Sequence, residues 1–149
     1  MKRNQTLNPE SMSKAARLFR LLDPAGRGRL LAGSARRTLS PGEVVCREGE
    51  VGSELFVLLS GKVSVTVDDF GTPHRVAGLG AGQFFGEMAA LTNGLRNATV
   101  TVDEEADLLC VSRACLLELL GDFPKLRTVL GRIGVARTEQ SFAKLSLAA

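Results

Sequence analysis

The spacing of hydrophobic residues changes twice along the chain, near residues 37 and 112. In the first part, apolar residues recur at helical spacing at Ala15, Leu18, Phe19 and Leu22. Asp23 and Pro24 interrupt this pattern, and they suit the cap and the first turn of a second helix over 24–32. Residues 1–36 are therefore predicted to form an N-terminal helical segment.

The middle part, 37–112, consists of short runs rich in β-branched and aliphatic residues. The runs are Val44–Cys46, Leu55–Leu59, Val63–Val67, Arg75–Leu79, Ala98–Val102 and Leu108–Ser112. In the third run valines alternate with polar residues, which is the period-two pattern of a half-buried strand. Ser60-Gly61 and the stretch from Asp68 to Gly71 are typical of turns. This spacing predicts an antiparallel sandwich or barrel rather than a parallel sheet.

The last part, 113–149, returns to helical spacing. Ser112 can cap a helix that carries leucines at 116, 117, 119 and 120, and Gly121-Asp122 can end it. Pro124 can start a further helix. Its apolar stripe is formed by Leu126, Leu130 and Ile133, and ends at Arg137.

Composition narrows the class of protein. With 149 residues, of which 44% are hydrophobic, the chain has the size of one domain, and no apolar run reaches the ~20 residues that cross a bilayer. The polar N-terminus lacks the apolar stretch of a secretory signal, so a cytoplasmic location is predicted. Cys46, Cys110 and Cys115 are expected to be reduced thiols. Because His74 is the single histidine and is expected in an exposed loop, we expect neither a metal site nor an enzyme.

The net charge of +3 conceals an uneven distribution. Up to residue 37 there are nine basic residues against two acids, whereas between 43 and 107 there are eleven acids against four basic residues. The acidic middle and the absence of Trp and Tyr argue against direct binding to nucleic acid. The basic N-terminal segment is either a solvated helix face or a surface for an acidic partner or membrane.

The segment between residues 80 and 100 carries the most chemistry. It predicts a glycine bend, a helical turn that begins near Gly86, a second bend at Asn93-Gly94, and then a strand. A helix that starts at glycine lets an anion approach its main-chain N–H groups. Arg96 can pair two phosphate oxygens, and the Glu87 carboxylate can accept hydrogen bonds from a sugar hydroxyl. The alternative is a simple ion pair between these two residues.

Residues 85–100 closely resemble the phosphate-binding cassette of the cyclic-nucleotide-binding domain family. The matching residues are Phe85-Gly86-Glu87-Met88-Ala89 and Arg96-Asn97-Ala98-Thr99-Val100. The likeness extends from Leu18 to Arg137 and includes the family's structural glycines, here Gly42, Gly49, Gly61 and Gly82. It implies a mainly β fold with flanking helices: an eight-stranded antiparallel, jelly-roll-like β-roll over 37–112, with N-terminal helices over 1–36 and a C-terminal helical lid within 113–149.

The resemblance also implies a role for each matching residue. Arg96 would pair the cyclic phosphate, and Glu87 would accept the ribose 2′-hydroxyl. Main-chain N–H groups would complete the phosphate site around Gly86, Met88, Ala89 and Ala98. The apolar wall against the base would be formed by Val65, Leu79 and Met88. By its place along the last helix, Arg137 would be the residue that closes over the base as a lid.

Two positions depart from the family's pattern. Leu95 replaces the Pro of many relatives, which should loosen the entry to Arg96. Asn97 stands where many cAMP binders have Ala or Ser and many cGMP binders have Thr. The missing Thr favours cAMP over cGMP, but the Asn97 amide could also donate to phosphate or to guanine, so base choice stays open.

The leading hypothesis is a cyclic nucleotide sensor that switches a partner through its C-terminal helix. We expect its output to go to a protein partner or to a second copy of the chain, since we find no helix-turn-helix pattern and expect no direct DNA binding. One alternative is a ligand-free protein-interaction module with a degenerate cassette, although both Glu87 and Arg96 are retained. Another is a truncated cyclic-nucleotide-responsive transcription regulator, which the natural-looking start at Met1 disfavours.

Overall fold

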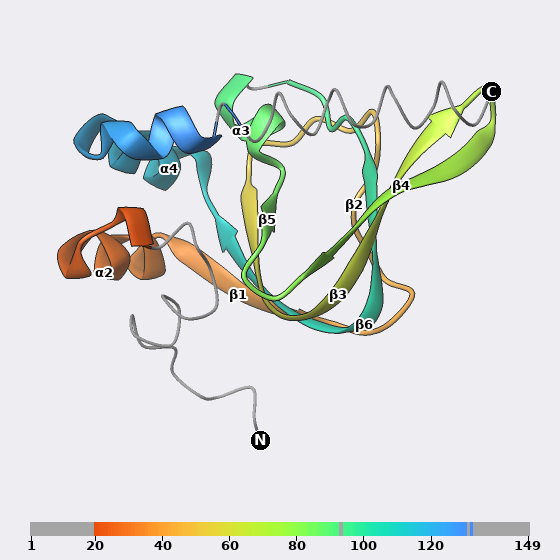
Figure 1. Cartoon of the computed structure of the whole chain (residues 1–149), viewed down its shortest axis with the longest axis horizontal. Coiled ribbons are helices and arrows are strands. Elements are labelled where there is room, and N and C mark those ends of the chain that lie inside the picture. Colours follow the sequence, from red (N-terminus) through yellow and green to blue (C-terminus); the bar gives the residue numbers. More distant parts are fainter. Residues whose placement is uncertain (1–19, 93, 131, 133–149) are drawn as a thin grey trace.

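The computed structural model describes residues 20–92, 94–130 and 132. Within them the chain forms a mainly antiparallel β sheet with helices gathered at one end, as Figure 1 shows. This arrangement confirms the predicted fold class. The first predicted helix, with Ala15, Leu18 and Phe19, lies outside the described residues, and so do Ile133 and Arg137.

The first described helix is α2, Pro24–Ala32. Asp23 caps it as predicted, since Gly26 N donates to Asp23 Oδ1 at 2.7 Å. Strand β1, Ser34–Leu39, follows at once, so the β part begins slightly before the predicted boundary at residue 37.

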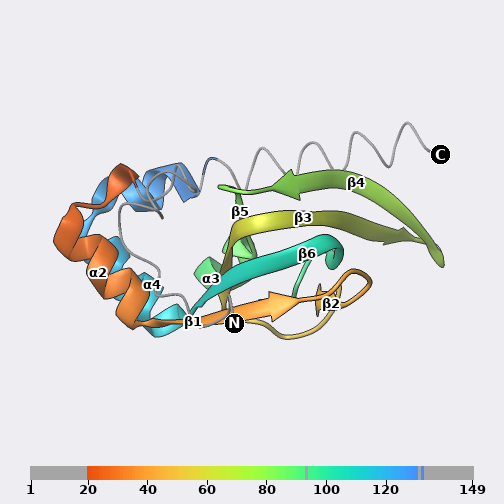
Figure 2. The same cartoon turned by 90° about the horizontal axis from the view of Figure 1, so that it is seen from below.

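Within the described residues, six strands form one sheet. They are β1, β2 (Val44–Cys46), β3 (Leu55–Asp69), β4 (Thr72–Gly80), β5 (Phe84–Phe85) and β6 (Thr99–Val111). The strand order is β1-β6-β3-β4, with β2 also paired to β6 and β5 also paired to β3. Figure 2 shows β4, β3, β6 and β1 in this order. All pairs are antiparallel.

The sheet has six continuous strands where eight separate ones were predicted, and it is not closed. Strand β3 covers two predicted runs: its first half pairs with β5 and its second half with β4. Strand β6 also covers two predicted runs: its first half pairs with β2 and its second half with β1. The predicted turn at Ser60-Gly61 is wrong, because these residues lie inside β3 at a shift in its register with β6.

Gly61 makes the bend inside β3 possible. Its φ is +93°, and a Cβ atom there would lie 2.2 Å from the main-chain oxygen of Glu105. Only glycine fits such a position without strain. The β3–β4 turn was predicted correctly at Phe70 and Gly71, which both have positive φ. His74 is a further correction: it lies in β4, half-buried and 3.6 Å from Asp69, rather than in an exposed loop.

The helices after the sheet begin as predicted. Helix α4, Arg113–Asp122, is capped by Ser112, whose side chain accepts a hydrogen bond from Cys115 N at 3.2 Å. Residues 124–130 are again helical. In Figure 2 α2 and α4 lie together beside the strands.

The part of the chain that the structure describes contains two separate hydrophobic clusters. The helical core joins the helices to one end of the sheet and consists of Leu22, Leu30, Leu55, Val57, Phe84, Ala90, Leu109, Val111, Leu116, Leu119, Leu120, Leu126 and Leu130. The roll core lies between the strands and consists of Leu39, Phe56, Leu58, Val63, Leu79, Phe85, Val100, Val102, Ala106, Leu108 and Cys110. Neighbours Phe84 and Phe85 thus enter different cores, because successive strand side chains point to opposite faces.

Candidate functional site

The glycine bend, the short helix and the strand of the cassette form as its sequence predicts, whereas Asn93 of the predicted second bend lies outside the described residues. Strand β5 leads into Gly86, helix α3 covers Glu87–Thr92, and β6 starts at Thr99. Gly86 has a φ of +85°, and a Cβ atom there would lie 2.7 Å from Arg96 Nη1 and 2.9 Å from the Glu54 main-chain oxygen. Glycine is therefore required at this point both by backbone conformation and by space.

Arg96 is a buried cation with defined partners. The whole residue is only 6% exposed. Its Nη1 atom donates to the main-chain oxygens of Glu54 at 3.0 Å and Gly86 at 3.4 Å. Its Cζ atom lies 5.0 Å from the centre of the Phe56 ring, which stacks in turn on Phe85. The guanidinium group therefore joins the β2–β3 loop to the start of α3 and rests on the roll core.

The main chain of Arg96 strengthens the same connection. Its N–H donates to Glu50 O, and Gly49 N–H donates to Arg96 O, both at 2.8 Å. An isolated antiparallel bridge between Val51 and Leu95 continues this short pairing. The β2–β3 loop is thus held against the cassette by backbone hydrogen bonds beside this bridge.

The β2–β3 loop contacts Arg96, but it was not predicted from the sequence as part of the site. Arg96 was predicted from its place in the cassette, but the loop residues that hold it are more than forty positions away, as the separation of 42 between Glu54 and Arg96 shows. The glycines of the loop were the available signal, because a chain that approaches another group closely often needs glycine.

Glu87 is the first residue of α3, and it is 4% exposed. A carboxylate in the first helical turn interacts favourably with the helix dipole. Among the described residues, the hydrogen bonds that Arg96 donates from its guanidinium go to main-chain oxygens. Carbonyl groups thus hold the Arg96 guanidinium group in place.

The other predicted site residues differ in their environment. Ala89 is buried at 3% exposure, Leu79 belongs to the roll core, and Val65 packs against that core from β3. Asn97 is exposed and Ala98 is half-buried. The main chain of Met88 lies in α3, whereas its side chain and the whole of Arg137 lie outside the described residues.

The pKa of the Cys46 thiol is influenced by the charge of Arg96. Burial raises the pKa of Cys46 above its ordinary value, and the charge of Arg96 only partly opposes this effect. Burial likewise raises the pKa of Cys110 and of Cys115. All three cysteines are free. Their raised pKa keeps them protonated at neutral pH, which makes them weak nucleophiles.

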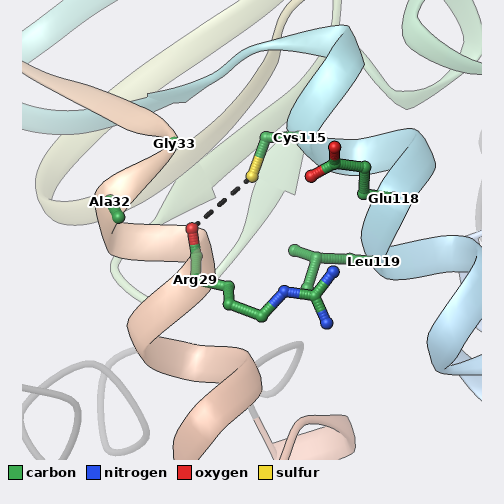
Figure 3. Close-up of a pocket in the computed structure, with 6 residues that line it drawn as sticks. All are labelled: Arg29, Ala32, Gly33, Cys115, Glu118 and Leu119. Atoms are coloured by element: carbon green, nitrogen blue, oxygen red, sulfur yellow. Dashed lines mark hydrogen bonds between the residues drawn. The ribbon is translucent and has the colours of Figure 1, made fainter.

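A cavity of about 340 Å³ lies elsewhere, between α2 and α4. Figure 3 shows the six residues that line it: Arg29, Ala32, Gly33, Cys115, Glu118 and Leu119. The Cys115 Sγ atom faces the main-chain oxygen of Arg29 at 3.7 Å. None of these residues belongs to the cassette, so the cavity and the cassette are separate places in the fold.

The residues that the structure describes offer no grouping of three or more His, Cys, Asp or Glu side chains that could hold a metal ion. In the same residues, no helix is long and apolar enough to cross a membrane.

Comparison with known proteins identifies the family. The family model "Cyclic nucleotide-binding domain" matches residues 36–123, which is more than half of the chain and reaches from β1 to the end of α4. The chain therefore belongs to the cyclic nucleotide-binding domain family.

Relatives and solved structures agree with this assignment. Over 123 residues the chain is 32% identical to a cyclic nucleotide-gated potassium channel of Rhizobium etli, covering 83% of this chain and 33% of that protein. The crystal structure of Thermus thermophilus catabolite activator protein matches with a TM-score of 0.75 and 30% identity, over 88% of this chain and 62% of that one. cAMP-bound PfPKA-R matches in fold, with a TM-score of 0.81 and 22% identity, over 93% of this chain and 46% of that one.

The chain spans about a third of the length of the channel that it matches. The similarity therefore concerns one part of that larger protein.

Proposed function

We propose that this domain binds a cyclic nucleotide between the cassette and the roll core, and that Arg96 pairs the cyclic phosphate. The observation that carries the proposal is the buried guanidinium group, held through Nη1 by the Glu54 and Gly86 carbonyls. Among the described residues, Nε and Nη2 of Arg96 have no hydrogen-bond partner. This leaves donors for the two oxygens that a guanidinium group pairs in a phosphate. Main-chain N–H groups around Gly86, Met88, Ala89 and Ala98 complete the phosphate site in the proposal.

The sugar and the base fall to different residues. The Glu87 carboxylate accepts the ribose 2′-hydroxyl, since an ionised carboxylate is acceptor-only. Val65 and Leu79 supply an apolar wall, and both belong to or pack against the roll core on which Arg96 rests. Met88 and the lid residue Arg137 are the remaining members of the proposed site.

The base preference that we propose is cAMP over cGMP. Asn97 replaces the Thr that follows the cassette Arg in many cGMP binders, and Asn97 is exposed. An exposed amide next to Arg96 adds no buried donor for a guanine. This preference is expected to be small.

The domain is proposed to act by switching, with no chemistry of its own. Phe84 and Ala90 of the cassette region belong to the helical core, together with Leu126 and Leu130 of the helical stretch 124–130. A ligand that moves the cassette thus changes the packing of the C-terminal helix, and differential affinity for the two arrangements makes a switch. We propose a cytoplasmic location and a protein partner or second copy as the receiver of the signal.

Calorimetric titration of the purified protein tests this proposal. We expect saturable binding of cAMP, weaker binding of cGMP and no binding of a cyclic dinucleotide, whose two phosphates would need a second cation. Dissociation constants weaker than about 1 mM for both cAMP and cGMP, equivalent to about 4 kcal/mol of binding free energy, would overturn it. The domain would then fit the alternative of an interaction module with a degenerate cassette.

A further inference from the structure

Gly52 in the β2–β3 loop lies against the guanidinium group of Arg96. A Cβ atom on Gly52 would lie 2.1 Å from Nε, 2.5 Å from Cζ and 2.8 Å from Nη2 of Arg96. Real Cβ atoms do not approach other atoms so closely, so a side chain at position 52 and the present position of Arg96 exclude each other.

The reason for glycine at this position is space rather than backbone conformation. Gly52 does not have the positive φ that marks Gly42, Gly49, Gly61, Gly71, Gly82 and Gly86. Alanine could therefore adopt its φ without strain. The overlap with Arg96 is then the specific consequence of a substitution by alanine.

Neither partner of this contact can move away without losing hydrogen bonds. The loop that carries Gly52 is tied to the cassette by Gly49 N–H to Arg96 O and by Arg96 N–H to Glu50 O. The head of Arg96 is held by the Glu54 and Gly86 carbonyls. Of the two partners, the Arg96 side chain moves more easily than the loop, because its far end can rotate while the sheet stays intact.

We infer that Gly52 is a positioning residue for the phosphate site: the missing side chain lets the Arg96 guanidinium stay where it can meet the ligand. The inference deepens the proposed function and rests on it. It assigns a binding role to a residue outside the cassette, through a contact with Nε and Nη2, the two atoms left for the phosphate.

The test uses Gly52→Ala, with Gly80→Ala as a matched control. Gly80 lies in β4, has no positive φ and has open space at its Cβ position. We expect Gly52→Ala to weaken cAMP binding by tenfold or more, which corresponds to about 1.4 kcal/mol, and Gly80→Ala to leave binding within about threefold of wild type. Binding by Gly52→Ala within about threefold of wild type would overturn the inference.

A second pair of variants separates positioning from general damage. Arg96→Ala removes Nε and the guanidinium head and so relieves the overlap with an alanine at position 52. In the wild-type background we expect Arg96→Ala to weaken binding strongly, whereas in the Gly52→Ala background it should cost markedly less, because the guanidinium group is already displaced. Additive losses would show that Gly52 acts independently of Arg96, which would overturn the inference.

The wild-type titration keeps the two claims apart. If wild type binds cAMP but Gly52→Ala binds equally well, the inference fails and the proposed function stands. If wild type binds no cyclic nucleotide, the proposed function fails, and the unfolding midpoints of wild type, the two single variants and the double variant still test the contact. A lowered midpoint in Gly52→Ala that Arg96→Ala restores supports the positioning role, whereas additive midpoints overturn it.

Discussion

The two cores of this domain differ in the charged side chains that lie beside them. At the helical core the buried residues are apolar, and the nearby Arg29–Asp122 ion pair stays about half exposed on the surface. Beside the roll core, by contrast, Arg96 lies over Phe56 and is 6% exposed, and Glu87 at the start of α3 is 4% exposed. Burial of a charge costs several kcal/mol unless partners compensate it. A cation kept buried beside the roll core therefore favours ligand binding at the cassette, whereas the apolar residues of the helical core serve packing.

The largest expected effect on cAMP affinity, and the one that would sharpen this contrast most, comes from removing the Arg96 side chain. Arg96→Ala removes a charge-assisted pair from an enclosed site, so we expect cAMP affinity to fall by about 2–5 kcal/mol, or roughly 30-fold to several thousand-fold. Arg29→Ala, which removes the same side chain at the other core, is the control and should bind as wild type does. Calorimetry measures both. Binding by Arg96→Ala within about threefold of wild type would show that Arg96 is not the phosphate ligand.

A smaller effect is expected at Glu87, and it depends on the ligand. Compared with cAMP, 2′-deoxy-cAMP should bind wild type more weakly by about 1.5–3 kcal/mol, the range for a hydrogen bond to a charged group. Glu87→Gln should distinguish the two ligands much less, because a neutral amide makes a weaker bond to the hydroxyl. The four dissociation constants, of two ligands from two proteins, form a thermodynamic cycle that isolates the contact between Glu87 and the 2′-hydroxyl. Equal discrimination by both proteins would place the 2′-hydroxyl elsewhere.

At the helical core, the expected effect concerns stability and leaves binding alone. Ser112→Ala removes the cap that accepts the Cys115 N–H, and we expect the free energy of unfolding to fall by about 1 kcal/mol. Denaturant unfolding measures this change, while cAMP affinity at low temperature should stay at the wild-type value. A loss of affinity comparable to that of Arg96→Ala would abolish the proposed division between the two regions.

The smallest expected effect tests the connection between the regions. Because Phe84, Ala90, Leu126 and Leu130 share the helical core, bound ligand should slow amide hydrogen exchange in residues 124–130 several-fold. The Val63–Val67 segment of β3 serves as the internal reference and should change less. Equal protection of 124–130 with and without ligand would make this helix a fixed wall, and the signal would have to leave by another element.

The features that sequence predicted correctly are those determined by neighbouring residues. Asp23 and Ser112 were found as caps because capping depends on a side chain and the next few N–H groups. The cassette was predicted for the same reason, since its bend, its short helix and Arg96 follow one another within a few residues. Local chemistry is directly visible in a sequence.

The features that sequence did not predict depend on distant contacts. Whether Ser60-Gly61 turns the chain or bends one long strand depends on its pairing with β6, and the period of the valines is the same in both cases. His74 was placed in a loop because Gly71 and Pro73 suggested a turn, although pairing with β3 extends β4 back to Thr72. The contacts of Arg96 with Gly52 and Glu54 depend on the same long-range pairing.

The pairing of β3 with β6 has a consequence for the order of folding. Leu55 pairs with Val111, and the whole cassette lies between these two residues in the chain. Bringing such distant segments together has an entropic cost that local contacts do not repay, which slows the folding of sheets of this kind. We therefore expect the proposed phosphate site to form late in folding. During synthesis, the site is expected to form only after Val111 has become available to pair with Leu55, and a peptide of residues 85–100 alone would have no β2–β3 loop to hold its arginine.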